Sequence, residues 1–331
     1  MGESFKTHRI TGMAVDPIHV GTGGGRLGRV DQSIVRDPVT RVPKIPGSSL
    51  AGVYRAYCAM HQQSSAPSRT IDGSPKPYYP DCAGQGQPDK QGKRGHCGKH
   101  NCPICTVFGF ARSAGGGFAG LAAFSDAQVL LFPVATREGP VWITCPGAMR
   151  LVGAGMGELP DAAVYRSKGE QPLNLGWLLL PVEKLPEGND PKQWLNSTIP
   201  GFIGDRLAVV SDKLFSHIVN SNLEVRTSVS INPETGAAEE GALFTYEALP
   251  RSTVLLWEVI CKNPAHFKVG NAAVDAVKDT DEVFNVVAAA HPYMECLGIG
   301  GMGTRGMGRL RVLSPRATPQ QPVAPKPTGG A

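Results

Sequence analysis

HVGTGGGRLGRVD, residues 19–31, contains five glycines and two arginines and ends on an aspartate. Glycines let a backbone approach a ligand closely, and free amides in such a loop can bind phosphate oxygens. The stretch is not a dinucleotide-binding fingerprint, because no predicted helix follows it, and no Lys-Ser or Lys-Thr ends it as in a Walker loop. It therefore indicates either a phosphate-binding loop of another kind or a purely structural glycine loop.

A second stretch of the same character lies near the end of the chain. LGIGGMGTRGMGRLRV, residues 297–312, is again rich in glycine and carries Arg305, Arg309 and Arg311. Two basic glycine loops in one chain fit a long backbone ligand better than a small molecule. The pair therefore favours nucleic-acid binding.

The charge of the chain is unevenly distributed. The first 118 of its 331 residues carry 15 Lys or Arg against 7 Asp or Glu, whereas the remainder carries 18 against 21. A local basic surface attracts polyanions, although a solvated lysine-rich face is the alternative interpretation. No run of 18 apolar residues is present, and MGESFKTHRI at the N-terminus has no export signal. The sequence therefore predicts a cytoplasmic protein that has no membrane partner.

Hydrophobic patterning and turn signals predict an α+β fold, namely a ferredoxin-like domain with large insertions. A first strand is expected over residues 4–20, followed by a hairpin-like connection and a helix over 50–60 with Ser48 or Ser49 as its N-cap. The later elements are strands in 121–133 and 141–144, an irregular region over 154–200, two strands in 223–247 around NPETG, a strand over 252–261, a helix over 281–291 and a final strand.

Residues 61–117 lose hydrophobic periodicity and gather potential metal ligands. These are Cys82, Cys97, His100, Cys102 and Cys105. Thiolate and imidazole groups close in sequence, in an insertion poor in core residues, are typical of a structural zinc site. The preferred set is Cys97, Cys102 and Cys105 with either His100 or Cys82 as the fourth ligand, and His96 is a more remote candidate; chance free thiols are the alternative. Cys58, Cys145, Cys261 and Cys296 fall in apolar runs and are expected in the core.

Asp31, at the end of the first loop, has two interpretations. It forms a surface ion pair with Arg26, Arg29 or Arg36, or it orients a divalent ion or assists deprotonation of a ribose 2′-hydroxyl. Glu239, Glu240 and Glu247 flank the predicted hairpin and are expected to be solvated. His291 is expected to be a hydrogen-bonded side chain without a ligand role.

Several segments taken together resemble the RAMP superfamily, specifically the backbone subunits of type III CRISPR effector complexes of the Cmr type. The segments are HVGTG at 19–23, LGRVD at 27–31, RDPVTRVPKIPGSSLAG at 36–52, CPICTVFG at 102–109, FSDAQVLLFPVATREGPVWITCP at 124–146, GALFTYEALP at 241–250 and the late glycine loop. The resemblance covers most of residues 10–313.

This resemblance implies an RRM-like (ferredoxin-like) core over residues 1–60 and 118–313. It also implies a thumb β-hairpin at 222–247 within the core. The Cys-rich residues 61–117 are expected to form an insertion in this core, and the Pro-rich composition of residues 314–331 predicts a disordered tail. In the family, copies of the subunit stack along a guide CRISPR RNA with other type III subunits, and each thumb kinks the complementary target RNA, which is cut at regular intervals. The same binding and assembly without cleavage is the alternative function, and a nucleotide-binding enzyme is a distant third.

The resemblance also implies roles for individual residues. The acidic residue needed for target cleavage matches Asp31, acting with Mg²⁺ or another divalent ion, whereas the zinc of the insertion is structural. The implied RNA contacts are His19, Gly21, Gly23, Arg26, Lys44, Ser48, Ser49, Arg226, Tyr246, Glu247, Gly301 and Arg305. This chain departs from the family at Ala51, where a basic residue usually follows GSSL, and in the length and cysteine content of 61–101.

Overall fold

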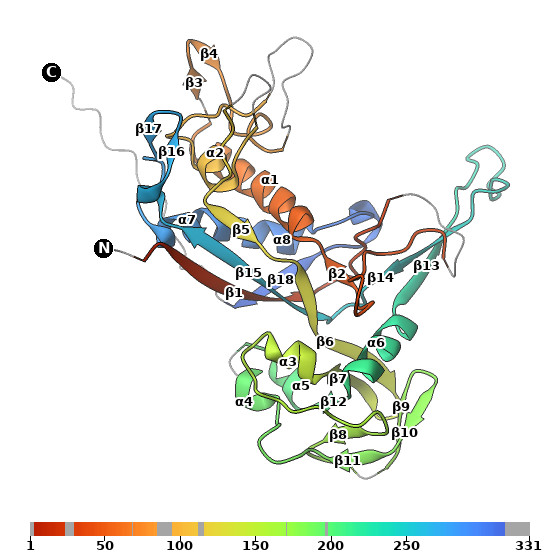
Figure 1. The fold of residues 1–331 in the computed structure, drawn as a ribbon. Coiled ribbons are helices and arrows are strands. Elements are labelled where there is room, and N and C mark those ends of the chain that lie inside the picture. Colours follow the sequence, from red (N-terminus) through yellow and green to blue (C-terminus); the bar gives the residue numbers. More distant parts are fainter. Residues whose placement is uncertain are drawn as a thin grey trace.

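The computed structural model describes residues 3–23, 30–67, 69–84, 95–111, 116–169, 171–195 and 198–314 (Figure 1). Residues 24–29 of the first glycine loop, with the predicted RNA contact Arg26, lie outside the described residues, as does the predicted tail beyond Ser314. Among the described helices, none is both long enough and apolar enough to cross a bilayer.

A large mixed sheet, of ten strands in the described part of the chain, runs through the molecule (Figure 1). Its strands are β1 (Phe5–Ala14), β2 (Lys44–Ile45), β5 (Ala122–Phe124), β6 (Ala127–Thr136), β7 (Gly139–Thr144), β8 (Val164–Arg166), β11 (Val182–Lys184), β12 (Leu207–Val209), β15 (Val254–Lys262) and β18 (Leu310–Ser314). The main path has the order β11-β8-β12-β7-β6-β15-β1-β18, with β2 paired to β6 and β5 to β15.

Strands β1 and β15 are neighbours in this sheet and lie between β18 on one side and β6 on the other. They pair antiparallel from Phe5 opposite Lys262 to Met13 opposite Val254. The sequence VLLWEVICK of β15 is rich in branched and aromatic residues, which favour strands. Gly12 has a packing role, because a Cβ atom there would lie 2.8 Å from the ring of the fully buried Trp257. The first predicted strand is therefore confirmed, although it ends at Ala14.

Helices cover one face of β1, β15 and β18 (Figure 1). They are α1 (Gly47–Ser65), α2 (Pro103–Phe108), α7 (Thr280–Ala288) and α8 (His291–Leu297). Leu50 and Tyr54 of α1 are buried in the main core, as the predicted apolar face requires. The presence of these helices over a mixed sheet confirms the α+β class.

The start of α1 corrects one prediction. The helix begins at Gly47, and its N-cap residue Pro46 makes no side-chain capping bond, so the expectation that Ser48 or Ser49 is the N-cap was wrong. Instead, the Oδ1 atom of Asp126 accepts a hydrogen bond of 2.8 Å from the Gly47 amide. A side chain at the start of β6 thus satisfies a free amide of the first turn, which local sequence does not reveal.

The predicted helix over 281–291 corresponds to α7, which ends at Ala288, and a separate helix, α8, begins at His291. His291 begins α8, is buried, and its Nε2 atom lies 3.1 Å from the hydroxyl of Tyr54 on α1. Its interpretation as a hydrogen-bonded side chain is therefore confirmed.

Residues 139–221 contain a second lobe (Figure 1), and a second hydrophobic cluster joins it to strands β1, β6 and β15 of the large sheet. Besides strands of the large sheet, it contains α3 (Pro146–Arg150), α4 (Lys192–Leu195), α5 (Gly201–Gly204), α6 (Asp212–Ser221) and the paired strands β9 (Leu173–Leu175) and β10 (Leu178–Leu180). The prediction that 154–200 is irregular was wrong, because three-residue strands are too short to produce a readable alternation.

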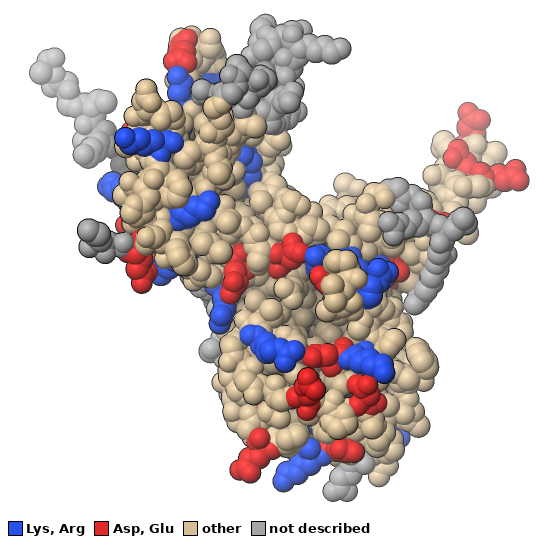
Figure 2. Space-filling view, viewed as in Figure 1, with Lys and Arg blue, Asp and Glu red and all other residues tan. Residues whose placement is uncertain are grey.

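A long hairpin projects from the molecule (Figure 1). It is formed by β13 (Glu224–Ser228) and β14 (Phe244–Ala248), which pair antiparallel with Arg226 opposite Tyr246. The predicted strands around NPETG are therefore confirmed. Figure 2 shows acidic side chains at the tip of the hairpin, where Glu234, Glu239 and Glu240 are exposed.

Small elements complete the fold. They are the strand pairs β3 (Thr70–Ile71) with β4 (Ser74–Pro75) and β16 (Lys268–Val269) with β17 (Ala272–Ala273), and the 3₁₀ turns η1 (Pro264–His266) and η2 (Gly303–Arg305).

Candidate nucleic-acid interface and cysteine centre

The two glycine loops meet in space. The amide of Gly301 donates a 2.8 Å hydrogen bond to the carbonyl of His19, and the two residues form an isolated β-bridge. Gly300 has a φ of +85°, a left-handed conformation in which a side chain is strained. A Cβ atom at Gly300 would also overlap the carbonyl oxygen of His19. Glycine is therefore required for the late loop to lie against the early one.

Replacing Gly300 by Ala is expected to lower the free energy of unfolding by about 2 kcal/mol, because left-handed backbone and steric overlap both penalise the new Cβ. The matched control is Gly303→Ala, since Gly303 has no heavy atom within 4 Å of an added Cβ and no positive φ. Urea unfolding of the two variants measures the difference. Equal midpoints for both would contradict the proposed tight contact.

His19 is held in a fixed orientation beneath this junction. Its ring is buried, and Nδ1 lies 2.6 Å from the backbone carbonyl of Glu247, so that Nδ1 carries the donated proton. In the neutral ring Nε2 is then an acceptor, and it faces Gly21, where an added Cβ would lie 3.0 Å away. The ring also meets the edge of Tyr246 at a centroid distance of 5.9 Å.

Asp31 lies near His19, bonded to the root of the hairpin. Its Oδ2 atom accepts hydrogen bonds from the amide of Thr245 at 2.7 Å and from the Thr245 hydroxyl at 2.9 Å. These bonds, first from the backbone amide and then from the hydroxyl, lower the pKa of Asp31 below its ordinary value. The side chain is exposed, so at neutral pH it presents a negative charge to the solvent.

These residues surround one hollow in the surface. It is lined by His19, Gly21, Thr22, Gly23, Asp31, Gln32 and Ser33. Hydrogen bonds between Gln32 and both Thr245 and Glu247 attach one wall of the hollow to β14. The hollow therefore combines backbone from the first glycine loop with a carboxylate, and the base of the hairpin supports its wall through bonds to Asp31 and Gln32.

Glu247 and Arg36 form a buried pair beside the hollow. The Oε2 atom of Glu247 accepts a 2.7 Å bond from Arg36 and a 3.3 Å bond from the amide of Ile34. The expectation that Glu247 is solvated was wrong, because only 7% of it is exposed. The expectation that Arg36 pairs with Asp31 was also wrong, since Arg36 is engaged by Glu247 and by Asn220.

Other predicted RNA contacts lie apart from the hollow's lining. Lys44 forms ion pairs with Asp126 at 2.7 Å and Asp37 at 3.5 Å, and Ser48 and Ser49 lie in the first turn of α1. Arg226 pairs with Glu224 at 2.6 Å. The exposed Arg305 stacks over Phe244 at 5.5 Å, which places it beside the hairpin root with Tyr246. Of the predicted site residues, His19, Gly21, Gly23 and Asp31 line the hollow. Tyr246, Glu247 and Gly301 contact His19 without lining the hollow, whereas Lys44, Ser48 and Ser49 lie apart from its lining.

Thr245 and Gln32 were missed by sequence reasoning, although both make contacts that shape the hollow. Thr245 lies within GALFTYEALP, one residue before the predicted Tyr246. The available signal was strand alternation, because residues two apart in a strand share a face, and Thr245 is two residues before the predicted contact Glu247.

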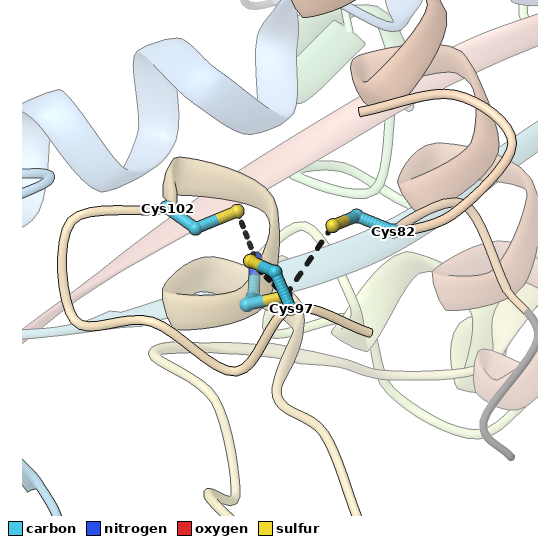
Figure 3. Close-up of side chains that lie close together, drawn as sticks. Cys82, Cys97 and Cys102 are labelled. Atoms are coloured by element: carbon cyan, nitrogen blue, oxygen red, sulfur yellow. Dashed lines mark hydrogen bonds between the residues drawn. The ribbon is translucent and has the colours of Figure 1, made fainter. Parts of the chain in front are cut away.

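Four cysteines gather at the insertion (Figure 3). The sulfur atoms of Cys82, Cys97, Cys102 and Cys105 all lie within 4.8 Å of one another, and Cys105 lies 3.6 Å from Cys97 and 3.7 Å from Cys82. A tetrahedron with zinc–sulfur bonds of about 2.3 Å has sulfur separations of about 3.8 Å. The cluster therefore has the dimensions of a four-thiolate metal site.

The local structure around the cluster is set by α2. The thiol of Cys102 caps this helix by accepting a hydrogen bond from the amide of Cys105, and Pro103 occupies its first turn. Hydrogen bonds from the thiols of Cys102, Cys105 and Cys82 lower the pKa of Cys97, whereas within the same group of thiols the pKa values of Cys102 and Cys105 are raised.

The structure selects Cys82 over His100 as the fourth member of the cluster. His100 is turned away, with Nδ1 3.0 Å from a carboxylate oxygen of Asp275, so its alternative role as a ligand was wrong. His96 is not in the cluster either. Cys58, Cys145 and Cys261 are buried as predicted, but Cys296 is exposed at the end of α8, contrary to the prediction.

The model of one protein family, the RAMP superfamily, matches residues 13–311. The chain belongs to the RAMP superfamily. The matched range includes the residues of the surface hollow, the cysteine cluster and the hairpin.

Similar proteins indicate which kind of RAMP protein this chain resembles. The chain is 24% identical to the CRISPR system Cmr endoribonuclease Cmr4 of Pyrococcus furiosus, over 95% of this chain and 97% of that protein. Its fold is similar to a subunit of a type III-B Cmr-beta complex bound to cognate target RNA, with a TM-score of 0.57 and 15% identity over 94% of this chain and 99% of the other. It is also similar to oligomeric Cmr4 from Pyrococcus furiosus, with a TM-score of 0.53 and 19% identity over 94% and 99% of the two chains.

The resemblance to Cmr-type RAMP subunits of type III CRISPR complexes, predicted from the sequence, is therefore confirmed.

Proposed function

We propose that this RAMP protein is the guide-RNA-binding filament subunit of a type III CRISPR interference complex and that it cleaves complementary target RNA. The observation that carries the proposal is the hollow, which the first glycine loop and an ionised Asp31 line. The late glycine loop packs against it through the bond from Gly301 to His19, and the root of the hairpin through the bond from Thr245 to Asp31. Backbone amides and arginine side chains bind phosphates, and the Asp31 carboxylate would take part in cleavage of the target RNA strand.

The strand order supports a ferredoxin-like core. The strands β18-β1-β15-β6 are adjacent and antiparallel, and α1 follows the first of them in the sequence whereas α7 and α8 follow the third. This is the arrangement of a βαββαβ unit. In this interpretation, residues 61–117 and 139–221 are insertions, and the hairpin of β13 and β14 is the thumb.

The relatives support the proposed partners. The similar Cmr4 of Pyrococcus furiosus is an endoribonuclease and was crystallised as an oligomer, and the similar Cmr-beta complex binds cognate target RNA. We therefore assign guide CRISPR RNA, target RNA, copies of this chain and other type III subunits as its partners.

The proposed cleavage uses the neighbouring ribose of the target strand. The 2′-oxygen attacks the adjacent phosphorus, the bond from phosphorus to the 5′-oxygen breaks, and the proton of the 2′-hydroxyl is lost while the leaving oxygen gains one. Kinking by the thumb lines up these atoms, and proximity supplies much of the rate. The backbone of the guide RNA, to which the target strand is paired, would be held by the amides of Gly21 and Gly23 and by the guanidinium of Arg305.

Asp31 is suited to hold a divalent ion. Its lowered pKa keeps it ionised at neutral pH and makes it a poor proton acceptor, which favours a metal-binding or electrostatic role over that of a general base. Carboxylates are preferred ligands of Mg²⁺, which when bound neutralises charge on the attacked phosphate.

We also propose that the cysteine cluster binds one structural Zn²⁺. Four protein thiolates leave no open position for a substrate, so the ion would stabilise the insertion and take no part in cleavage.

The alternative is a scaffold subunit that binds RNA without cutting it. The scaffold alternative is supported by the two hydrogen bonds that Asp31 accepts from Thr245, because these bonds give the aspartate a purely structural role.

Purification of the complex from cells that transcribe a CRISPR array tests the proposed binding. We expect it to carry short guide RNAs and to bind complementary RNA with an affinity that falls steeply as salt concentration rises, because phosphate contacts release counterions. Sequencing of the bound RNA and binding titrations at several salt concentrations provide the measurement. Recovery of a small nucleotide with no RNA would instead support a nucleotide-binding enzyme.

A further inference from the structure

Two arginines lie against the cysteine cluster, namely Arg69 of the insertion and Arg55 of α1. Arg69 donates to the sulfur of Cys97 at 2.9 Å and approaches that of Cys82 at 3.8 Å. Its guanidinium also lies 4.0 Å from the centre of the Tyr78 ring. A planar guanidinium between an aromatic face and a thiolate is held in one orientation.

Arg55 approaches the cluster from α1. Only 8% of it is exposed, and it donates hydrogen bonds of 2.7 Å to the carbonyls of Cys82 and Gly109. Its Nη2 atom is buried and has no hydrogen-bond partner. Within the described residues, neither Arg55 nor Arg69 forms an ion pair with a carboxylate. A buried cation of this kind is costly unless an opposite charge lies nearby.

The cysteine cluster supplies that opposite charge once it holds zinc. Four thiolates carry four negative charges, of which Zn²⁺ neutralises two, so the centre keeps a net charge of about −2. The two guanidinium groups carry the matching positive charge. We propose that Arg55 and Arg69 are the counter-charges of a four-thiolate zinc centre and set its affinity for the metal. This inference rests on the proposed zinc site.

The zinc affinity of the full-length chain tests this role. Competition with a chromophoric zinc chelator at neutral pH is expected to show about 10–100-fold weaker binding for Arg69→Gln and for Arg55→Gln, the range typical of lost outer-sphere partners. Arg69→Lys keeps the charge and should stay close to the wild-type affinity. The matched control is Arg166→Gln in the second lobe, where a largely buried arginine pairs with Glu138 at 2.8 Å; its zinc affinity should equal that of the wild type.

Binding of cobalt in place of zinc shows whether a variant has lost only the positive charge or also the arrangement of its four thiolate ligands. Arg69→Gln should keep the visible absorption of tetrahedral cobalt thiolate, because its four ligands are intact. Wild-type affinity in Arg69→Gln, or an Arg69→Lys variant as weak as Arg69→Gln, would overturn the counter-charge role. Should Arg55→Gln fail to fold, the Arg69 variants decide the matter. A wild-type chain that contains no zinc and gives no cobalt thiolate absorption would instead overturn the zinc site itself.

Discussion

Replacing Asp31 by Ala in the assembled complex is expected to slow target RNA cleavage by about 10²–10⁴-fold while guide and target binding remain intact. The carboxylate is exposed in the hollow and ionised at neutral pH, so its removal deletes charge at the site without opening the core. Single-turnover cleavage of a labelled target RNA measures the rate, and a binding titration with the same RNA measures affinity.

Two further variants test whether the loss of cleavage comes from the negative charge of Asp31. Asp31→Asn keeps an oxygen that can accept the bond from Thr245 but removes the charge, so it should be as slow as Asp31→Ala. Glu239→Ala removes an exposed carboxylate from the hairpin tip and should cut at the wild-type rate. Unchanged cleavage by Asp31→Ala with intact binding would establish the scaffold alternative in place of the enzyme.

Replacing Cys97 by Ser is expected to lower the free energy of unfolding by about 4 kcal/mol or more, because the loss of a structural metal is among the most costly single changes. Cys97 contributes one of four gathered sulfur atoms, and the described insertion contains only short elements such as α2, β3 and β4 to hold it otherwise. Chemical unfolding of the purified protein, together with its zinc content, provides the measurement.

Cys296→Ser is the matched control, since Cys296 is free, exposed and remote from the cluster. It should bind as much zinc as the wild type and unfold at the same denaturant concentration. If Cys97→Ser were as stable as this control and contained as much zinc, the cluster would not be a metal site.

The fold was partly readable along the chain. The first strand, the helix that contains GSSL, the strands around NPETG and the final strand all follow from apolar spacing and turn residues, which act over a few neighbouring positions. The short strands of the second lobe escaped prediction, because they are defined by pairing with distant strands and not by their own alternation.

The candidate site was likewise only partly predictable from the sequence. The residue types of the site can be read directly along the chain: two glycine loops, an aspartate at 31, the segment FTYEA and a group of cysteines in a core-poor insertion. Which of these residues meet depends on the folded structure. It brought Thr245 to Asp31, paired Glu247 with Arg36, and chose Cys82 over His100. The physical reason is that hydrogen bonds and metal ligation depend on distances of a few ångströms between side chains. When the partners are about 200 residues apart in sequence, as Asp31 and Thr245 are, packing of the whole chain sets those distances.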